Sequence, residues 1–411
     1  MTKKPQIAIL TTARSDFGPL KRVIRLAANH FGVDLLVSGS HFLSSRGNSY
    51  EEIWNEFNQC ENLKLTLFNS MIDDDSASGQ VNTIAQTQLK ASKWFSTNRC
   101  DLLLFLGDRW ELWGVTLPAF LHGIPLAHIS GGEVTEGVID DSVRHSHTKI
   151  ASLHFAATNE FALNISRMGE EDWRICVVGE CGLDLVHDSE MDSKAEVYNN
   201  FKIDLDHPTI LVTFHPSTLD HEVVAHKQID PILKALTKFS QYQIVFTAPG
   251  VEQGSEEILI RIQEFCASQH NSLLINHLGS RGYLAVLRHS LAVIGNSSSG
   301  LLEAPSLGVP CINVGNRQGQ RLAAASVQHV GYETSEIVKA IEIAVTPEFR
   351  MFTQNCANPY DPYGDGKNSL RIVMAIKNAL SNFSSETLRF KKFNNIVYTE
   401  SWNSLLLSGA T

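Results

Sequence analysis

The segment Val293-Ile-Gly-Asn-Ser-Ser-Ser-Gly-Leu-Leu-Glu303 passes from an apolar strand pattern through a small polar turn into a helical pattern. The same succession opens the chain, where the apolar run from Ile7 to Thr11 leads into a polar turn, and it recurs at Leu102-Leu-Leu-Phe-Leu-Gly-Asp-Arg-Trp-Glu111. Short apolar runs continue to alternate with helical patterns beyond these segments, which is typical of a parallel sheet with helices on both faces. The sequence therefore predicts an α/β fold.

The expected elements form two series. The first half has strand patterns at residues 7–11, 33–38, 102–106, 125–129, 154–157 and 175–178, with helical patterns at 19–29, 80–96, 112–121, 141–152 and 159–168. The second half has strand patterns at 209–214, 243–247, 272–276, 292–295 and 310–314, with helical patterns at 188–206, 230–239, 256–268, 282–290, 298–306, 335–343 and 368–382. Since 411 residues are enough for two domains, we expect two doubly wound domains whose strands carry ligand sites at their carboxyl ends. The expected divisions are residues 1–188, 189–367 and 368–411, and from residue 384 the chain has no clear period and is expected to be a loosely specified tail.

The composition excludes several classes of function. The formal charge is −10, and no stretch concentrates Lys and Arg, so we expect neither nucleic acid nor an anionic membrane as a partner. The seven cysteines are scattered and contain no CxxC pair, which favours reduced thiols in the cytoplasm and no zinc site. No apolar segment is long enough to cross a bilayer.

Charged residues follow the expected strands of the first half. Arg14 lies in the turn after the first strand and suits a phosphate, although pairing of Arg14 with Asp16 at the surface is the alternative. Asp108 and Arg109 follow a second strand, and Glu133 follows a third after two glycines. Carboxylates gathered at one sheet edge can separate their pKa values, which provides an acid and a base.

A helix shortly after Glu133 carries further candidates. Asp141, Arg144 and His145 are spaced i, i+3 and i+4 and share one face, whereas His147 faces differently and makes a poor metal pair with His145. Asp140 and Asp141 stand where helix caps are common, so capping is as good an explanation for either residue alone.

Polar residues also follow the strands of the second half. His215 ends one strand, and Ser297 and Ser298 form a turn that offers hydroxyls and free amides to a diphosphate, although capping of the next helix is the better explanation of these serines when they are taken alone. Glu303 could accept hydrogen bonds from a ribose diol, and Arg317 could neutralise phosphate. The chain contains neither GxGxxG nor GxxxxGK[ST], so nicotinamide chemistry and ATP hydrolysis lack their usual motifs.

Taken together, these motifs resemble the UDP-N-acetylglucosamine 2-epimerase family and specifically its hydrolysing branch. The matching strings, in chain order, are Arg14-Ser-Asp-Phe-Gly, Ser38-Gly-Ser-His41, Gly107-Asp-Arg, His128-Ile-Ser-Gly-Gly-Glu133, Ile139-Asp-Asp-Ser-Val-Arg-His145, Phe214-His-Pro, Ile294-Gly-Asn-Ser-Ser-Ser-Gly, Glu303-Ala-Pro-Ser-Leu-Gly and Gly315-Asn-Arg-Gln. The resemblance implies two Rossmann-like domains of the glycosyltransferase-B type, facing a cleft, with UDP held mainly by the second domain and the sugar by the first. It also implies a C-terminal helix that crosses back to the first domain, and it requires no metal and no nicotinamide.

The resemblance also implies roles for individual residues. UDP contacts are expected from Arg14, Arg109, His215, Ser297, Ser298, Glu303 and Arg317. Sugar contacts are expected from His41, Asp108, Glu133, Asp140, Asp141, Arg144 and His145. We expect Glu133 and Asp140 to transfer protons, assisted by Asp108 and His215, while UDP leaves and water adds to the resulting 2-acetamidoglucal.

Other interpretations remain open at this stage. The substrate is expected to be UDP-N-acetylglucosamine, and the alternative is the 2,4-diacetamido-trideoxy UDP-sugar used by similar enzymes of legionaminic acid synthesis. Three other functions are alternatives. The first two are a glycosyltransferase, which would not need the Glu133 and Asp140 cluster, and a catalytically silent UDP-sugar-binding protein, which would not need the catalytic carboxylates. The third is a non-hydrolysing epimerase, but that branch usually has a different sequence around Phe214-His-Pro-Ser217. The resemblance suggests a homodimer or a dimer of dimers.

Overall fold

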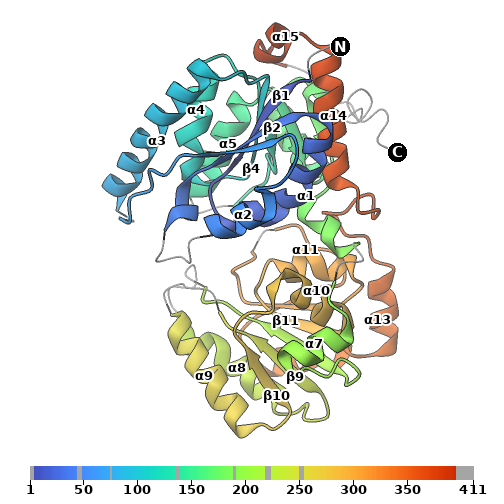
Figure 1. Ribbon diagram of the computed structural model, residues 1–411. Helices are drawn as coiled ribbons and strands as arrows, with labels where there is room; N and C mark the ends of the chain where they lie inside the picture. Colours follow the sequence, from blue (N-terminus) through green and yellow to red (C-terminus); the bar gives the residue numbers. More distant parts are fainter. Residues whose placement is uncertain are drawn as a thin grey trace. The chain divides into compact units, whose positions relative to one another are not determined.

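The structure of the protein is a computed structural model, which describes residues 4–43, 49–74, 76–135, 139–187, 191–217, 224–249, 254–319 and 321–394. The chain divides into two compact units (Figure 1). Unit 1 comprises Met1–Asp184 and Asp365–Thr411, and unit 2 comprises Leu185–Gly364. Each unit contains a parallel sheet, which confirms the prediction of two Rossmann-like α/β domains.

The sheet of unit 1 has the strand order β3-β2-β1-β4-β5-β6-β7. Its strands are β1 (Gln6–Thr11), β2 (Gly32–Val37), β3 (Leu63–Leu67), β4 (Leu102–Leu106), β5 (Leu126–Ile129), β6 (Leu153–Ala156) and β7 (Ile175–Val177). The helices of unit 1 are α1 (Arg14–His30), α2 (Tyr50–Phe57), α3 (Ala77–Thr97), α4 (Trp113–Leu121), α5 (Ile139–Ile150), α6 (Asn159–Arg167), α14 (Asn368–Asn382) and α15 (Ser385–Arg389).

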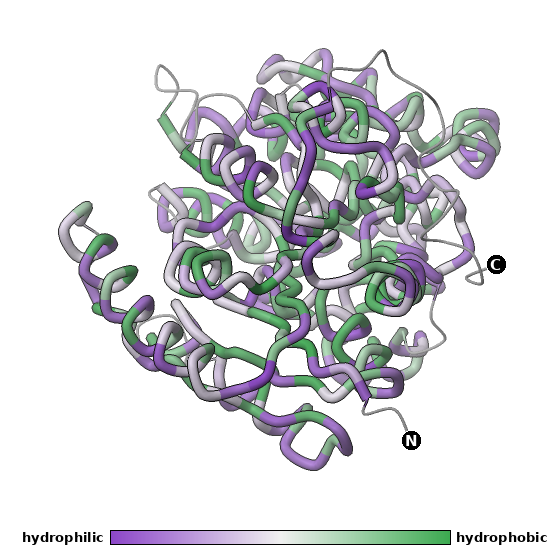
Figure 2. The backbone as a smooth tube through the Cα atoms, turned by 90° about the horizontal axis from the view of Figure 1, so that it is seen from above, coloured by the Kyte–Doolittle hydropathy of each residue, from purple (hydrophilic) through white to green (hydrophobic). Residues whose placement is uncertain are grey.

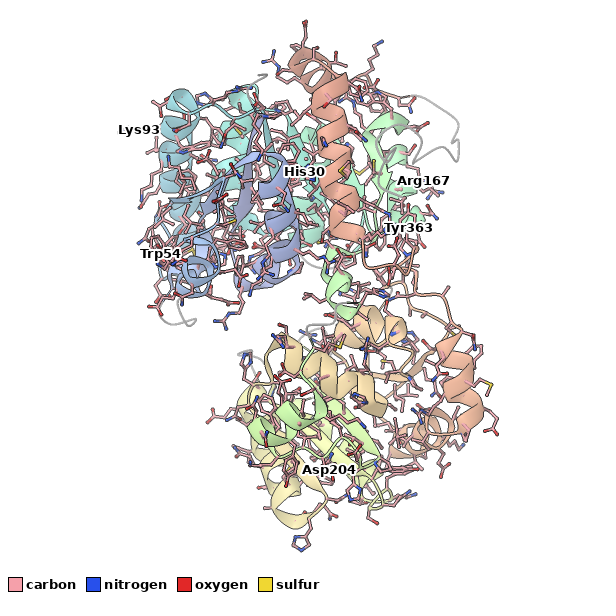
Figure 3. The ribbon with its side chains drawn as sticks, turned by 45° about the vertical axis from the view of Figure 1, so that its right-hand side comes forward. His30, Trp54, Lys93, Arg167, Asp204 and Tyr363 are labelled. Atoms are coloured by element: carbon pink, nitrogen blue, oxygen red, sulfur yellow. The ribbon has the colours of Figure 1, made fainter. Side chains whose placement is uncertain are left out.

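Strand alternation decides which helices cover which face of this sheet. In β1, Ile7 and Ile9 point toward a core shared with α1 and α14, whereas Ala8 and Leu10 point toward a core shared with α3 and α4. His30, at the end of α1, lies beside α14 (Figure 3). Both faces are therefore buried, as the continuous apolar strands predict.

Unit 2 repeats this arrangement with the strand order β10-β9-β8-β11-β12-β13. Its strands are β8 (Thr209–Thr213), β9 (Gln243–Thr247), β10 (Ser272–Ile275), β11 (Ser290–Gly295), β12 (Cys311–Val314) and β13 (Val327–Val330). Its helices are α7 (Lys194–Phe201), α8 (Ala225–Leu236), α9 (Ser255–Ser268), α10 (Gly279–His289), α11 (Ser299–Ser306), α12 (Thr334–Ala344) and α13 (Pro347–Gln354). Helices α8, α9 and α12 share one core with the sheet, and α7, α10 and α11 share the other. Hydrophobic and hydrophilic residues alternate along the helices (Figure 2), as expected for helices with one face on a sheet.

Several elements differ from the sequence prediction. The strands β3 and β13 and the helices α2 and α13 were not expected, because their short patterns are only half-buried and lack a continuous apolar run. The helix expected over residues 188–206 is confined to α7, which ends where Lys202 adopts a left-handed conformation with φ of 61°. Residues 188–190 lie outside the described residues.

The segment after α14 also corrects an expectation. Residues 384–394 were expected to begin a loosely specified tail, yet α15 and the residues after it pack on unit 1. The buried guanidinium of Arg174 donates to the carbonyl oxygens of Thr387 (2.8 Å) and Leu388 (3.0 Å). Lys391 donates to Glu170 at 2.7 Å. These long-range contacts leave no periodic signal in the sequence, and the rest of the tail lies outside the described residues.

Candidate active site

Each sheet has one point at which the strand order reverses, and several of the predicted site residues lie beside it. In unit 1 the reversal falls between β1 and β4, and in unit 2 between β8 and β11. Loops that leave the carboxyl ends of such neighbouring strands diverge and create a ligand crevice. Arg14 and Asp108 follow the two strands at the reversal in unit 1, and His215 and Ser297 follow those in unit 2.

The turn between β1 and α1 is organised by Asp16. This carboxylate is buried and accepts hydrogen bonds from the Thr12 amide (2.9 Å), the Thr12 hydroxyl (2.8 Å), the Ala13 amide (3.1 Å) and the Thr11 hydroxyl. Burial raises the pKa of Asp16 to about 6, although these hydrogen bonds act in the opposite direction. Arg14 is 62% exposed and lies 3.8 Å from Glu52, so the alternative pairing of Arg14 with Asp16 is wrong.

His41 lies beneath this turn. It is fully buried, its Nε2 is 2.9 Å from the Thr11 hydroxyl and its Nδ1 is 2.7 Å from the Ser49 hydroxyl. Burial and the charges of Arg109 and Arg14 lower the pKa of His41 to about 4. The imidazole is therefore neutral and engaged at both nitrogens, which fits support of the turn better than direct contact with a sugar.

The loop after β4 carries a buried ion pair. Arg109 Nη2 donates to Glu111 at 2.5 Å, and the Glu111 side chain is 2% exposed. Burial works against the charged form of Arg109, but Glu111 outweighs it and raises the pKa of Arg109. Asp16 and Asp140 act in the same direction, so this cation lies among carboxylates from the segments that follow β1, β4 and β5.

Arg144 connects the loop after β4 with the loop after β5. Its side chain is 3% exposed; Nη1 donates to the Glu133 carbonyl (2.9 Å) and the Thr135 hydroxyl (3.0 Å), and Nη2 pairs with Asp108. Asp141 accepts from the Thr135 amide at 2.7 Å. Arg144 is thus a clamp between two loops rather than an exposed sugar contact.

Asp140 belongs to the same cluster. Burial, followed by the charge of Asp108, raises the pKa of Asp140, whereas Arg109 and Arg144 lower it. His145 Nε2 lies 3.5 Å from Asp141, on the shared face that the spacing predicts. The structure therefore brings two interacting carboxylates together, which is the arrangement needed to separate an acid from a base.

Glu133 is presented by a tight turn. Ser130 has φ of 61° and Gly132 has φ of 81°, and a Cβ at Gly132 would lie 2.2 Å from the Phe161 carbonyl oxygen. Asn164 donates to the Gly132 carbonyl oxygen at 2.9 Å. Gly132, the second of the two glycines noted in the sequence, thus fixes the backbone immediately before the carboxylate.

In unit 2, Asn296 fixes the position of His215. The fully buried Asn296 side chain accepts from the His215 amide at 2.8 Å and donates to the His215 carbonyl at 2.8 Å. The backbone of Gly295 passes so close to β8 that a Cβ there would lie 1.9 Å from the Thr213 carbonyl oxygen. The two strand ends at the reversal point are therefore locked together.

The serine turn, formed by Ser297 and Ser298, directly follows Asn296 and precedes α11. Ser298 stands at the N-cap of α11 but makes no side-chain capping bond, whereas Ser297 Oγ accepts from the Ser299 amide at 3.4 Å. Arg317 and Gln318, after β12, donate to the Asn296 carbonyl oxygen at 3.3 and 2.9 Å. Glu303 lies one turn into α11. The predicted residues of unit 2 thus gather around the amino end of one helix.

The residues of these networks that were not predicted as site residues include Asp16, Glu111 and Asn296, and Tyr283 joins them through its hydrogen bond with Ser299. Asp16 and Glu111 each lie two residues after a predicted arginine, Arg14 and Arg109. This short spacing is the feature of the sequence that could have identified them as site residues. Tyr283 lies on α10 and could not be identified from the local sequence, because its partner Ser299 is on another helix.

Among the described residues no group of three His, Cys, Asp or Glu side chains could hold a metal ion, and none of the helices described here is long and apolar enough to span a membrane.

Comparison with known proteins adds independent findings. The family model described as UDP-N-acetylglucosamine 2-epimerase matches residues 25–377. The chain is 32% identical to the polysialic acid biosynthesis protein P7 of Escherichia coli, over 90% of this chain and 93% of the relative. It is 30% identical to a hydrolysing GDP/UDP-N,N′-diacetylbacillosamine 2-epimerase of Campylobacter jejuni, over 95% and 99%.

A solved structure supports the fold. The crystal structure of UDP-GlcNAc 2-epimerase from Neisseria meningitidis bound to UDP-GlcNAc matches with a TM-score of 0.72 and 19% identity, covering 92% of this chain and 100% of that chain. At this identity the likeness concerns the fold alone.

Proposed function

The chain belongs to the UDP-N-acetylglucosamine 2-epimerase family, and we propose that it is a hydrolysing 2-epimerase that converts UDP-N-acetylglucosamine and water to N-acetylmannosamine and UDP. Relatives named for hydrolysing epimerisation and for polysialic acid biosynthesis support a role in making nonulosonic acids. A UDP-2,4-diacetamido-trideoxy sugar is the alternative substrate, since the Campylobacter relative is named for diacetylbacillosamine.

The observation that carries the proposal is the cluster of Asp108 and Asp140, held between Arg109 and Arg144 beside the Glu133 turn. The hydrogen on C2 of the sugar is weakly acidic, so its removal requires a positioned carboxylate. Asp140 is suited to proton transfer because burial and the charge of Asp108 raise its pKa, and Asp108 itself is paired with Arg144.

The reaction proceeds in two steps in this scheme. Glu133 or Asp140 takes the C2 proton, the C2–H electron pair forms the C1=C2 double bond, and the C1–O bond breaks so that UDP leaves with its electron pair. Water then adds its hydroxyl to C1 and a proton returns to C2 from the opposite face, which gives the manno sugar. The two carboxylates therefore serve opposite faces of C2.

The residues of unit 2 would bind the nucleotide. His215, the serine turn and Arg317 offer hydrogen-bond donors and positive charge to the diphosphate, and these contacts strengthen as the leaving group gains charge. Glu303 would accept from the ribose diol. In unit 1, Arg14 and Arg109 would add charge to the departing phosphate, while His41, Asp141, Arg144 and His145 would position the sugar loops.

We further propose a cytoplasmic enzyme that acts as a homodimer or dimer of dimers. All seven cysteines are free thiols, which is the state expected in a reducing compartment.

The test is a proton NMR time course in deuterium oxide, with UDP-N-acetylglucosamine and the diacetamido UDP-sugar offered separately. We expect free UDP and a manno sugar carrying deuterium at C2, and the faster reaction names the substrate. Glu133→Gln or Asp140→Asn should lower kcat by about 100- to 10,000-fold while UDP still binds. The exposed Glu61→Gln variant is the matched control and should react normally. Intact, undeuterated sugar nucleotides would overturn the proposal.

A further inference from the structure

Five hydroxyl groups form a continuous chain within unit 2. It begins at Thr247, the last residue of β9, and continues through Thr213, the last residue of β8, to Tyr283 on α10, Ser299 on α11 and Ser297 in the serine turn. Thr247 donates to Thr213 at 3.1 Å, Tyr283 is hydrogen bonded to both Thr213 and Ser299, and Ser299 donates to Ser297 at 3.1 Å. Elements far apart in sequence thus share one polar network.

Counting hydrogens fixes the direction of this chain. Each hydroxyl has one hydrogen to donate. Ser299 gives its hydrogen to Ser297, so Tyr283 must donate to Ser299. The hydrogen of Tyr283 is then used, so Thr213 must donate to Tyr283.

Among the described residues, the chain of hydroxyls therefore ends at Ser297, whose own hydrogen is not used within the chain. Ser297 Oγ accepts from the Ser299 hydroxyl and from the Ser299 amide. Within the part of the chain that the structure describes, the Ser297 hydroxyl hydrogen has no acceptor. This donor lies just before the amino end of α11, where the helix dipole also favours negative charge.

The buried phenol keeps this direction at neutral pH. Burial raises the pKa of Tyr283 to about 12, so its hydroxyl retains its proton and remains a donor. Hydroxyls linked in series polarise one another, so the terminal donor is stronger than an isolated serine.

We propose that Tyr283 is a positioning residue that orients the serine turn for the diphosphate of the nucleotide. Because Tyr283 donates to Ser299 and Ser299 donates to Ser297, the Ser297 hydroxyl can offer only its hydrogen to a ligand. A ligand at this position must therefore accept a hydrogen bond, as a phosphate oxygen does. The inference rests on the proposed function, because it assigns the diphosphate to this turn. A purely structural role, in which the bond only ties α10 to α11, predicts a loss of stability without a selective loss of UDP binding.

The experiment measures UDP binding by calorimetry, together with thermal unfolding of each variant. Tyr283→Phe should weaken UDP binding by about tenfold, because the orientation of a hydrogen bond to a charged group is lost. Tyr198→Phe is the matched control, since Tyr198 lies on α7 in the same unit, is 54% exposed and should bind UDP as the wild type does.

A second pair of variants tests the chain even if Tyr283→Phe fails to fold. Thr213→Val removes a hydroxyl at constant shape and should weaken UDP binding, whereas Thr213→Ser keeps the hydroxyl and should restore it. The loss of UDP affinity should decrease with distance from Ser297 along the chain of hydroxyls. It should be largest in Ser299→Ala, smaller in Thr213→Val and smallest in Thr247→Val.

The outcomes separate the two proposals. Wild-type UDP affinity in folded Tyr283→Phe, or equal losses in Thr213→Ser and Thr213→Val, would overturn the role of Tyr283 while leaving the enzyme's function intact. A wild-type protein that does not bind UDP would overturn the proposed function itself.

Discussion

At the scale of single residues, Gly132 decides how Glu133 is presented. Its φ of 81° and its approach to the Phe161 carbonyl oxygen leave no room for a side chain. We expect Gly132→Ala to lower kcat by at least about tenfold and the free energy of unfolding by roughly 2 kcal/mol, because the turn must shift. Steady-state kinetics and urea unfolding measure the two effects.

Gly18 provides the matched control. It lies inside α1, and a Cβ at this position would meet nothing within 4 Å. Gly18→Ala should leave kcat unchanged and change the free energy of unfolding by less than about 1 kcal/mol, because helix propensity favours alanine whereas the following Pro19 disfavours a Cβ here. Equal behaviour of the two variants would show that the Gly132 turn does not position the carboxylate.

At the scale of elements, α14 depends on a cap supplied from far away in the sequence. The buried Asp184 carboxylate accepts from the amides of Asn368 and Ser369, both at 2.8 Å, and lies 3.7 Å from Arg22. We expect Asp184→Ala to cost about 2–3 kcal/mol of unfolding free energy, because two buried amides lose their acceptors. Hydrogen exchange of α14 should accelerate, as measured by mass spectrometry.

Asp184→Asn keeps one acceptor oxygen and is the graded control. It should lose about half as much stability as the alanine variant. Unchanged exchange in α14 for both variants would mean that packing on α1 alone holds this helix.

At the scale of the whole molecule, unit 1 contains four buried histidines whose pKa is lowered by burial: His41, His128, His147 and His154. Unfolded histidine takes up a proton below pH 6.5, whereas His41 and His147 do so only near pH 4 when folded. Stability should therefore fall as the pH drops from 6.5 toward 4, by about 1.4 kcal/mol per pH unit for each such group. Asp16, with its pKa raised to about 6, offsets part of this loss below pH 6.

Chemical unfolding at pH 7 and pH 5 measures this slope. His147→Gln should flatten it, whereas the exposed His207→Gln in unit 2 should leave it unchanged. A slope that His147→Gln does not alter would mean that this imidazole is not neutral in the folded protein.

Much of the fold could be predicted from local pattern. The strands β4 and β9 and the helix α14 have the predicted bounds, because a continuous apolar run or a strong helical period marks each one. The half-buried strands β3 and β13 could not be predicted, since tertiary pairing at a sheet edge stabilises them rather than their own composition. The order of the strands likewise depends on long-range contacts.

The sequence by itself determined the α/β class, the loops that carry the candidate residues and the family, because these depend on local period and on ordered motifs. Only the tertiary structure decided what each candidate does locally. It placed Arg144 and His41 in buried networks, brought Asp140 next to Asp108, and linked Tyr283 to the serine turn. The physical reason is that pKa values and hydrogen-bond direction depend on burial and on partners far away in the chain, and no local pattern records them.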